Sequence, residues 1–366
     1  MKPIAIIGAG SYVGARLIEQ AELRAELPLV SIVRSKRSQG RLARFGVRTV
    51  QGDASDPASL VPLLRGCGMA VNLTSGDDKR IVGDVQSIYR ACGEAGVPLF
   101  VHMSSGEVFG RADEVDLQED SLPDGNHWME YGREKAAAEG WLRSQPNDRV
   151  QTVILRPGLI WGPGSGWLVG PAQALIDGTA YLFNEGRGIC NLIHVDNLIG
   201  HLVQLACSED VGSGVFNVSD IETHSWAGYY EAIATEIGVD PSTILRLPES
   251  DFPEDWRMQK LIRLAKVAPA MAIKRRMADE TKLRIKQNLR NWIRPPAREA
   301  EPIKPTPSVE KGMWWIQGTA RKLPSNAFKE RYPGLQLQEF PELMAAAGHW
   351  LRYAGFEPTG SFELNS

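Results

Sequence analysis

Residues 2–14 read KPIAIIGAGSYVG, an apolar run that leads directly into a glycine-rich turn. The run is typical of a buried strand, and the residues after it have the periodicity of a helix. A turn built from Gly8 and Gly10 lets backbone amides approach a pyrophosphate at the positive end of that helix, and Gly14 lets the helix pack closely on the strand. Because any strand–helix turn favours glycine, this stretch alone predicts the local fold better than it predicts a ligand.

The strand–helix alternation continues through the first 157 residues. Between the apolar runs lie helix-like stretches such as SLVPLLRG (59–66) and GDVQSIYRACGEAG (83–96). Strands that are apolar along their whole length, each followed by a helix, are typical of a parallel sheet covered on both faces. The sequence therefore predicts an α/β fold with a Rossmann-type, doubly wound parallel sheet. Its expected strands are IAIIG (4–8), LVSIV (29–33), VRTVQ (47–51), MAVNLT (69–74), LFVHM (99–103) and TVILR (152–156).

The chain after Pro157 is less regular, which predicts a second, smaller lobe. Residues 158–188 are rich in glycine and proline and show no clear period. Beyond them we expect helices at 194–207, 225–238 and near 340–354, and a returning strand at 214–219. We expect 1–157 plus 189–218 to form the dinucleotide-binding domain, and 158–188 plus 219–366 to form an α/β substrate-binding lobe with a basic helical insertion.

The composition is that of a globular protein, with 366 residues, 43% hydrophobic and 23% charged. The four cysteines are scattered, so we expect reduced thiols in a cytoplasmic protein. The chain starts on a strand-like run rather than on a signal peptide, and no apolar stretch approaches the roughly 18 residues that span a bilayer. His194 and His201 share one expected helix without a metal-ligand spacing, so no metal site is predicted.

The end of the second expected strand carries basic residues. Many NAD-binding folds place an acid there for the ribose hydroxyls, whereas VRSKRS (33–38) offers Arg34 and Lys36. Basic side chains at this place favour the 2′-phosphate of NADP, although a solvated basic loop gives the same pattern. Asp53, at the end of the third strand, either accepts a hydrogen bond from an adenine amino group or caps a helix. We therefore expect NADP as the cofactor, with NAD as the alternative.

Residues 128–139 read WMEYGREKAAAE and place Tyr131 and Lys135 one helical turn apart on the same face. A neighbouring ammonium favours the phenolate, so this spacing is suited to lowering the pKa of a tyrosine from about 10. Upstream, VHMSSGEVFG (101–110) puts Ser105 and Glu107 directly after a strand, at the edge where parallel sheets bind ligands. The order of phosphate turn, serine loop and Tyr–Lys helix indicates a catalytic site rather than an idle surface contact.

These motifs resemble those of the extended short-chain dehydrogenases/reductases, also called the NAD-dependent epimerase/dehydratase family. The resemblance runs from Ile4 to about Gly238 and resumes in about the last forty residues. SSGEVFG is similar to the family's S-S-x-x-V-Y-G, and YGREK to its Y-x-x-x-K. Three more stretches resemble its R-P-x-x-x-Y-G-P, its H-V-D-D-L helix and its strand before the substrate-side helix; they are ILRPGLIWGPG (154–164), NLIHVDNLIGHL (191–202) and GVFNVSD (214–220).

The resemblance implies a role for each motif residue. Ser105 would hold the substrate oxygen, Tyr131 would act on it as general acid or base, and Lys135 would hold the nicotinamide ribose and depress the pKa of the tyrosine. A hydride would pass between a substrate carbon and the nicotinamide, which the protein positions. The resemblance also implies cofactor contacts from Gly8, Gly10, Ser11, Tyr12, Val13, Gly14, Arg34, Lys36, Asp53, Ala54, Thr74 and Pro157.

Three departures from the family pattern bear on the substrate. The middle glycine of the phosphate turn falls at the position of Ser11, which calls for a slightly rebuilt turn. Dehydratases of nucleotide sugars have an Asp–Glu pair where this chain has Gly106 and Glu107, so Glu107 is either a second acid/base or a carboxylate bonded to backbone amides. Nucleotide-sugar enzymes carry a diphosphate-binding arginine at the position of Cys190, for which Arg187 would substitute only in a different loop.

A strongly basic segment lies outside the family pattern. Residues 256–298 contain thirteen Lys or Arg and two acidic residues, a net charge of +11 in a chain of net charge −3. In RMQKLIRLAKVA (257–268) the basic residues share one broad helical face, which suits the surface of an anionic membrane. A helix packed on its own subunit or on a dimer partner gives the same pattern. We expect a homodimer and no nucleic-acid binding, because no reader fold is recognisable.

The sequence thus predicts an NAD(P)-dependent enzyme that interconverts a secondary alcohol and a ketone. The substrate expected first is a sugar or nucleotide sugar of polysaccharide or glycoconjugate synthesis. The first alternative is an NADPH-dependent reductase of an apolar or cyclic ketone, as in the steroid and flavonoid branches of the family. The second is a non-catalytic sensor that binds NADP and a protein partner. The cytoplasmic protein would be peripheral at the membrane if the basic segment binds lipid.

Overall fold

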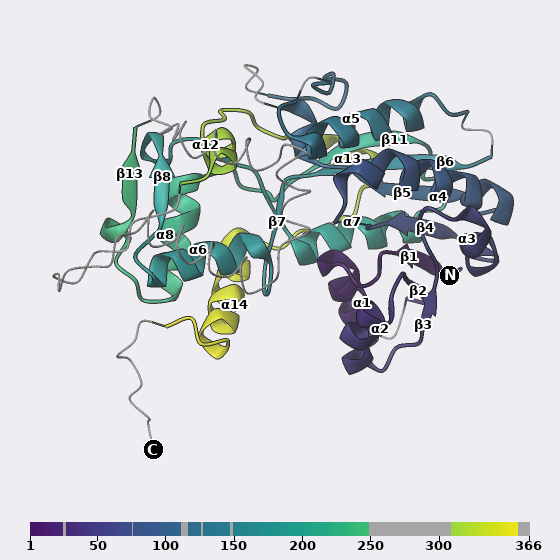
Figure 1. Cartoon of the computed structure of the whole chain (residues 1–366), viewed down its shortest axis with the longest axis horizontal. Coiled ribbons are helices and arrows are strands. Elements are labelled where there is room, and N and C mark those ends of the chain that lie inside the picture. Colours follow the sequence, from purple (N-terminus) through teal and green to yellow (C-terminus); the bar gives the residue numbers. More distant parts are fainter. Residues whose placement is uncertain are drawn as a thin grey trace, which may run out of the picture.

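The computed structural model describes residues 1–24, 27–74, 76–110, 116–125, 127–146, 149–248 and 309–357. These residues form a sheet-based domain and a smaller lobe beside it (Figure 1). The basic segment 256–298 and the membrane contact predicted for it lie outside the described residues. The homodimer and the division of the chain into two domains stay predictions.

The larger domain is built on a seven-stranded sheet in the order β11-β6-β5-β4-β1-β2-β3. All its neighbouring strands pair in parallel. The order reverses between β1 and β4, so the carboxyl ends of these two strands form the switch point at which doubly wound sheets bind ligands. The predicted fold class is confirmed. The strands are β1 (Ile4–Ile7), β2 (Leu29–Val33), β3 (Thr49–Gln51), β4 (Met69–Asn72), β5 (Leu99–Met103), β6 (Gln151–Pro157) and β11 (Gly214–Val218).

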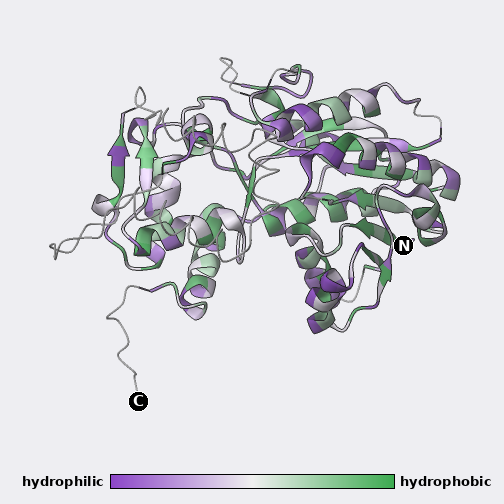
Figure 2. Ribbon diagram, viewed as in Figure 1, coloured by the Kyte–Doolittle hydropathy of each residue, from purple (hydrophilic) through white to green (hydrophobic). Residues whose placement is uncertain are grey.

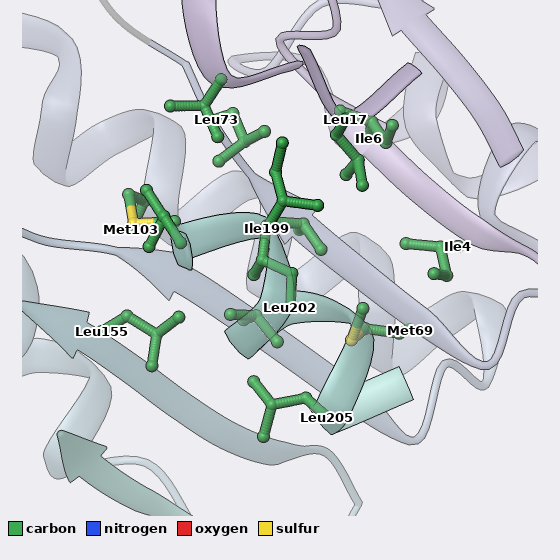
Figure 3. Close-up of a cluster of buried hydrophobic side chains, with 14 of the residues drawn as sticks. Ile4, Ile6, Leu17, Met69, Leu73, Met103, Leu155, Ile199, Leu202 and Leu205 are labelled. Atoms are coloured by element: carbon green, nitrogen blue, oxygen red, sulfur yellow. The ribbon is translucent and has the colours of Figure 1, made fainter. Parts of the chain in front are cut away.

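Helices cover both faces of this sheet because its strands are apolar on both sides. Ile4 and Ile6 of β1 face α1 (Tyr12–Arg24) and α7 (Val195–Cys207), whereas Ala5 and Ile7 face the opposite helices. Figure 3 shows the α7 side chains Ile199, Leu202 and Leu205 against the first of these faces. The opposite face is covered by α3 (Pro57–Leu64), α4 (Ile81–Ala95) and α5 (Glu130–Arg143), and α2 (Lys36–Leu42) follows β2.

The smaller lobe has its own core, centred on Trp161, Trp226 and Tyr229. The sequence predicted no helix in 158–188, yet Gly166–Ile176 form α6 although Pro171 lies inside it. Tertiary burial of Leu168, Ala172 and Leu175 outweighs the weak helix propensity of this stretch. The helices are α6, α8 (Trp226–Glu236), α12 (Lys311–Gln317) and α14 (Phe340–Tyr353), and the strands are β7 (Leu159–Trp161), β8 (Tyr181–Phe183), β9 (Ile189–Cys190), β10 (Leu192–His194), β12 (His224–Ser225) and β13 (Leu245–Leu247).

An extended segment, residues 318–325, joins the two units and is called the strap below. The carbonyl of Thr319 accepts from the amide of Ile189 at 2.8 Å, and the carbonyl of Leu323 accepts from Ser219 Oγ at 2.8 Å. After the strap, α13 (Asn326–Arg331) returns to the large domain, where the rings of Phe328 and Phe216 lie 5.4 Å apart. The C-terminal part of the chain therefore contributes to both cores.

The helices of both units carry apolar and polar residues on different sides (Figure 2). Of the helices that the structure describes, none has the length and apolar content to cross a membrane. The four cysteines are unpaired, and Cys207 is exposed while the other three are buried. Burial raises the pKa of Cys92 and Cys190, which keeps these thiols protonated.

Candidate active site

A cavity of about 240 Å³ lies at the switch point, beside the turn that follows β1. Gly8 adopts a φ of +89°, and a Cβ there would lie 2.7 Å from the carbonyl carbon of Leu73. The backbone of the turn therefore packs directly on the end of β4, which only glycine allows. Among the expected cofactor residues, those lining the cavity are Gly8, Gly10, Ser11, Arg34, Asp53, Ala54 and Thr74.

Ser11 and Gly14 shape the first turn of α1, and Ser11 also lines this cavity. Ser11 Oγ accepts a hydrogen bond from the amide of Gly14 at 3.1 Å, so the serine caps the helix that should face a pyrophosphate. A Cβ on Gly14 would lie 2.7 Å from the carbonyl oxygen of Ala9. Gly14 thus allows α1 to pack closely on the turn at Ala9 and does not line this cavity, so its contact with the cofactor stays a prediction.

The basic residues after β2 divide into two groups. Arg34 lines the cavity together with Ser35, Ser38 and Arg41. Lys36, expected from the sequence as a cofactor contact, is exposed on α2 and does not line it. Lys36 is the first residue of α2, and Arg41 lies more than one helical turn further along. Of these two side chains, Arg41 lines the cavity.

Asp53 lines the same cavity but is already engaged. Its Oδ1 accepts from the amide of Ser55 at 3.0 Å and pairs with Arg80 Nη2 at 3.1 Å. The Ser55 hydrogen bonds and the Arg80 charge lower the pKa of Asp53, so the side chain is ionised at neutral pH. The cap of α3 is Asp56, not Asp53.

A second cavity, of about 430 Å³, shares Ser11, Leu73 and Thr74 with the first and leads to the predicted catalytic residues. It is called the substrate cavity below. Ser105 comes from the loop after β5, and Tyr131 and Lys135 come from α5. The remaining expected residues in its wall are Tyr12, Val13, Glu107 and Pro157. Most of its other walls are apolar and include Leu73, Ile81, Met103, Leu159, Ile160 and Trp167.

Ser105 and Tyr131 line the same cavity, and the Ser105 hydroxyl is close enough to lower the pKa of the Tyr131 phenol. Ser105 is held in place because its Oγ accepts from the amide of Glu107 at 3.1 Å. Lys135 Nζ lies 5.8 Å from the centroid of the Tyr131 ring and donates to the carbonyl of Met103 at 2.6 Å. The loop after β5 and the inner face of α5 thus bring all three predicted catalytic groups together.

The pKa of Tyr131 is raised in this structure, contrary to the expectation from the Tyr–Lys spacing. Burial is the largest cause, and the negative charges of Glu107 and Asp78 add to it, whereas the Ser105 hydroxyl lowers the pKa. The ammonium of Lys135 is turned to the Met103 carbonyl instead of the phenol. Burial also lowers the pKa of Lys135 to about 8, against the charges of Glu139 and Asp78.

A buried ion pair supports α5 behind Lys135. Glu139 and Arg156 are fully buried, and Arg156 Nη2 lies 2.6 Å from Glu139 Oε2. Ser104 Oγ donates to Glu139 Oε1 at 2.5 Å. Since Lys135 and Glu139 are one turn apart on α5, this pair fixes the helix against β5 and β6.

Glu107 is held by two residues that the sequence did not identify. Arg321 of the strap binds Glu107 Oε1, and His127 Nε2 lies 3.6 Å from Glu107 Oε2. Burial raises the pKa of Glu107, but His127 and Arg321 outweigh burial and leave the pKa below its ordinary value. No spacing signal could reveal Arg321, because it lies 214 residues from Glu107 in the chain.

The positions that distinguish nucleotide-sugar enzymes are closed. A Cβ on Gly106 would meet Leu323 Cδ1 of the strap, so a larger residue there would require the Leu323 side chain to move. Cys190 is buried in the core of the smaller lobe, and Arg187 is exposed and lines neither cavity. His201 is a core residue whose Nδ1 lies 2.8 Å from the carbonyl of Asn197.

Of the tryptophans near the site, only Trp167 lines the substrate cavity. Trp161 is a core residue whose Nε1 donates to Asp220 at 2.8 Å. Within the described parts of the chain, no group of three His, Cys, Asp or Glu side chains is arranged to hold a metal ion.

Comparisons with known proteins agree with this arrangement. Residues 8–172 match the NAD(P)H-binding family model. The chain is 26% identical over 208 residues to a 2-alkyl-3-oxoalkanoate reductase of Stenotrophomonas maltophilia, a match that covers 53% of this chain and 62% of the reductase. It is 26% identical over 175 residues to a decarboxylating sterol-4-alpha-carboxylate 3-dehydrogenase of Schizosaccharomyces pombe, covering 46% of this chain and 52% of the dehydrogenase. The chain thus spans less than two thirds of the length of these relatives.

The fold is also shared with solved structures at low sequence identity. A dTDP-glucose 4,6-dehydratase from Bacillus anthracis, solved in complex with NAD, superposes with a TM-score of 0.68 at 11% identity. The superposition covers 98% of this chain and 99% of the dehydratase. Residues 8–172 thus form an NAD(P)H-binding domain, and the chain shares the fold of this dehydratase.

Proposed function

We propose that the protein is an NADP(H)-dependent oxidoreductase that interconverts a ketone and a secondary alcohol on a largely apolar substrate. The observation that carries this proposal is the grouping of Ser105, Tyr131 and Lys135 in one wall of the substrate cavity. That cavity adjoins the cavity beside the turn after β1, which is called the dinucleotide cavity below. Proton donor, oxygen-binding group and cofactor site therefore meet in one place.

The three side chains have distinct tasks in this reaction. The nicotinamide supplies a hydride in reduction and accepts one in oxidation. Ser105 and Tyr131 bind the substrate oxygen, and Tyr131 gives its phenol proton to that oxygen in reduction or takes a proton back in oxidation. The ammonium of Lys135, fixed by the Met103 carbonyl, supplies positive charge at the floor of the cavity. A raised tyrosine pKa suits the donor role, because the phenol is then protonated at neutral pH.

The apolar substrate is supported by the wall of the cavity. Its apolar residues come from both units, among them Ile81 and Met103 of the large domain and Ile160 and Trp167 of the smaller lobe. Burying apolar surface against such walls contributes about 25 cal/mol per Å². The relatives named as an oxoalkanoate reductase and a sterol-carboxylate dehydrogenase act on substrates with apolar bodies, which supports the same class.

A nucleotide sugar, the substrate expected first from the sequence, is the second candidate. The fold shared with the dTDP-glucose dehydratase favours it. Against it, a diphosphate needs exposed cations, and Arg187 lies outside both cavities while Arg321 is bound to Glu107. We therefore place the apolar ketone first.

NADP is favoured over NAD by the outer end of the dinucleotide cavity. Arg34 and Arg41 line it together with the hydroxyls of Ser35 and Ser38. Two guanidinium groups and two hydroxyls suit a phosphate monoester on the ribose.

The test replaces the proton donor. In Tyr131→Phe, kcat for NADPH-dependent reduction of propiophenone, followed by NADPH absorbance, should fall by about a hundredfold or more. Tyr353→Phe is the matched control, because Tyr353 is 90% exposed and should leave kcat unchanged. Turnover of UDP-glucose but not of propiophenone would favour the second candidate. Binding of NADPH without turnover of either, in wild type and variant alike, would favour a cofactor sensor.

A further inference from the structure

A small annex opens beside the substrate cavity. It has a volume of about 30 Å³ and shares Ser105, Glu107, Pro157, Gly158 and Leu159 with that cavity. This volume suits one water molecule or one small functional group, and no ring. Gly106 of the loop after β5 adds to its wall, and the other lining residues come from the smaller lobe and the strap: Ile189, Asn191, Trp226, Ile316, Thr319, Arg321 and Leu323.

Two charged side chains in the wall of the annex have unused hydrogen-bonding atoms. Arg321 has only 3% of its surface exposed, and its Nε has no hydrogen-bond partner among the described residues. Glu107 Oε2 also makes no hydrogen bond among the described residues, because the imidazole Nε2 of His127 lies 3.6 Å away, beyond hydrogen-bond distance. Leaving a buried polar atom unpaired costs about 1–3 kcal/mol, so such atoms in a native protein indicate a missing partner.

The chemistry of these atoms specifies that partner. Glu107 is ionised, since its pKa is lowered despite burial, and so its free oxygen only accepts hydrogen bonds. Arg321 Nε only donates. A hydroxyl group both donates and accepts, and therefore satisfies both atoms. A methyl group satisfies neither, a carbonyl satisfies only Arg321, and a carboxylate is repelled by Glu107.

The annex also has a fixed place relative to the reacting carbon. Ser105 lines both the annex and the substrate cavity, and its Oγ accepts from the amide of Glu107 at 3.1 Å. A substrate oxygen bound between Ser105 and Tyr131 therefore lies next to Glu107. A substituent on the carbon adjacent to the reacting carbonyl is the part of the substrate that reaches the annex.

We propose that the annex, with Glu107 and Arg321 as its polar groups, is a recognition subsite for a hydroxyl on the carbon next to the reacting carbonyl. The substrate class is then an α-hydroxyketone with an apolar body, which rests on the proposed function above. In its reduction a hydride adds to the carbonyl carbon and the Tyr131 proton adds to the carbonyl oxygen. The product is a vicinal diol, and the recognised hydroxyl keeps its bonds.

Three matched ketones test the subsite: propiophenone, α-hydroxypropiophenone and isobutyrophenone, which has a methyl group in place of the hydroxyl. In the wild-type protein kcat/KM for the hydroxyketone should exceed that for the methyl ketone by at least about tenfold, which corresponds to 1.4 kcal/mol. Equal values would overturn the subsite and leave a bound water as the content of the annex. Quenching of tryptophan fluorescence gives the three dissociation constants independently of turnover.

Two variants and a control locate the recognition. The double variant Glu107→Leu/Arg321→Met removes both charges together, which avoids an unpaired buried charge, and should bring the hydroxyl-to-methyl ratio close to one. Glu107→Gln should reduce the ratio by about threefold or more, and it serves if the double variant fails to fold. Arg246→Gln breaks the Arg246–Glu231 ion pair, 3.1 Å long and outside all these cavities, and should leave the ratio unchanged.

The outcomes separate the subsite from the proposed function. A ratio that stays high in both variants would overturn the subsite, because the hydroxyl would be recognised elsewhere. Turnover of all three ketones without preference would overturn the subsite and support the proposed function. Preferential binding of the hydroxyketone without turnover would support the subsite and overturn the proposed function. Failure to bind any of the three ketones would overturn both.

Discussion

The turn after β1 and the strap wall the two ends of a row of three adjoining cavities, but they use different parts of the chain. At the turn the backbone itself forms the wall, because Gly8 has a positive φ and its backbone packs against that of Leu73. In the strap the side chains of Arg321 and Leu323 form the wall, and both are buried. The cofactor end therefore excludes side chains, whereas the substrate end depends on individual ones.

Gly8→Ala should break the turn and gives the largest expected effect. The added Cβ would meet the backbone of Leu73 and Thr74 in a left-handed conformation, so we expect a loss of about 3 kcal/mol or more in the free energy of unfolding. Urea denaturation measures it. Gly40→Ala is the control, because a Cβ there meets nothing within 4 Å, and it should stabilise α2 by about half a kcal/mol. Equal stability of the two variants would contradict this account.

Leu323→Ala tests the other end. Leu323 is 4% exposed and packs with Val108, Phe109 and Leu117, so its truncation should lower the free energy of unfolding by about 3 kcal/mol. It should also widen the annex at Gly106. Leu122→Ala, at a side chain that is 83% exposed, should change stability by less than about 0.5 kcal/mol. A small loss in both would mean that the strap is not a structural wall.

Arg34→Ala tests whether the basic residues that line the dinucleotide cavity bind the cofactor while the exposed ones do not. Loss of a guanidinium beside the ribose should raise the Kd of NADPH by about tenfold and leave that of NADH unchanged. Lys36→Ala is the matched control, since Lys36 does not line the cavity. Fluorescence titration with both nucleotides measures the effect. An equal loss of NADPH affinity in the two variants would show that Lys36 also contacts the cofactor, and would contradict the division between cavity-lining and exposed basic residues.

The pH dependence of kcat/KM tests the role of Lys135 on α5, which lies between the turn and the strap. Burial lowers the pKa of Lys135 to about 8, so its ammonium is present below that pH and is lost as the pH rises through it. We expect kcat/KM to fall to about half its plateau near pH 8. Lys135→Arg should abolish this break, because arginine stays protonated. The pKa of His201 lies at about 4, so this residue cannot produce the break. A flat profile through pH 9 would show that the ammonium is not required.

The parts of the site that the sequence predicted are those encoded by short spacings. Ser105, Tyr131 and Lys135 were found because a strand end and one helical turn fix their geometry locally. Arg321 and Leu323 were not found, since their positions depend on a strap hundreds of residues away from the β5 loop. Lys36 follows the same strand as Arg34 but is exposed at the start of α2 and does not line the cavity.

By itself the sequence determined the doubly wound sheet, the glycine turn and the three catalytic candidates, because hydrophobic periodicity, glycine positions and i to i+4 spacing are properties of neighbouring residues. Only the tertiary structure decided that the phenol of Tyr131 has a raised pKa, that Glu107 is ionised and that an annex exists beside it. Those properties arise from burial and from charges that folding brings together across the whole chain.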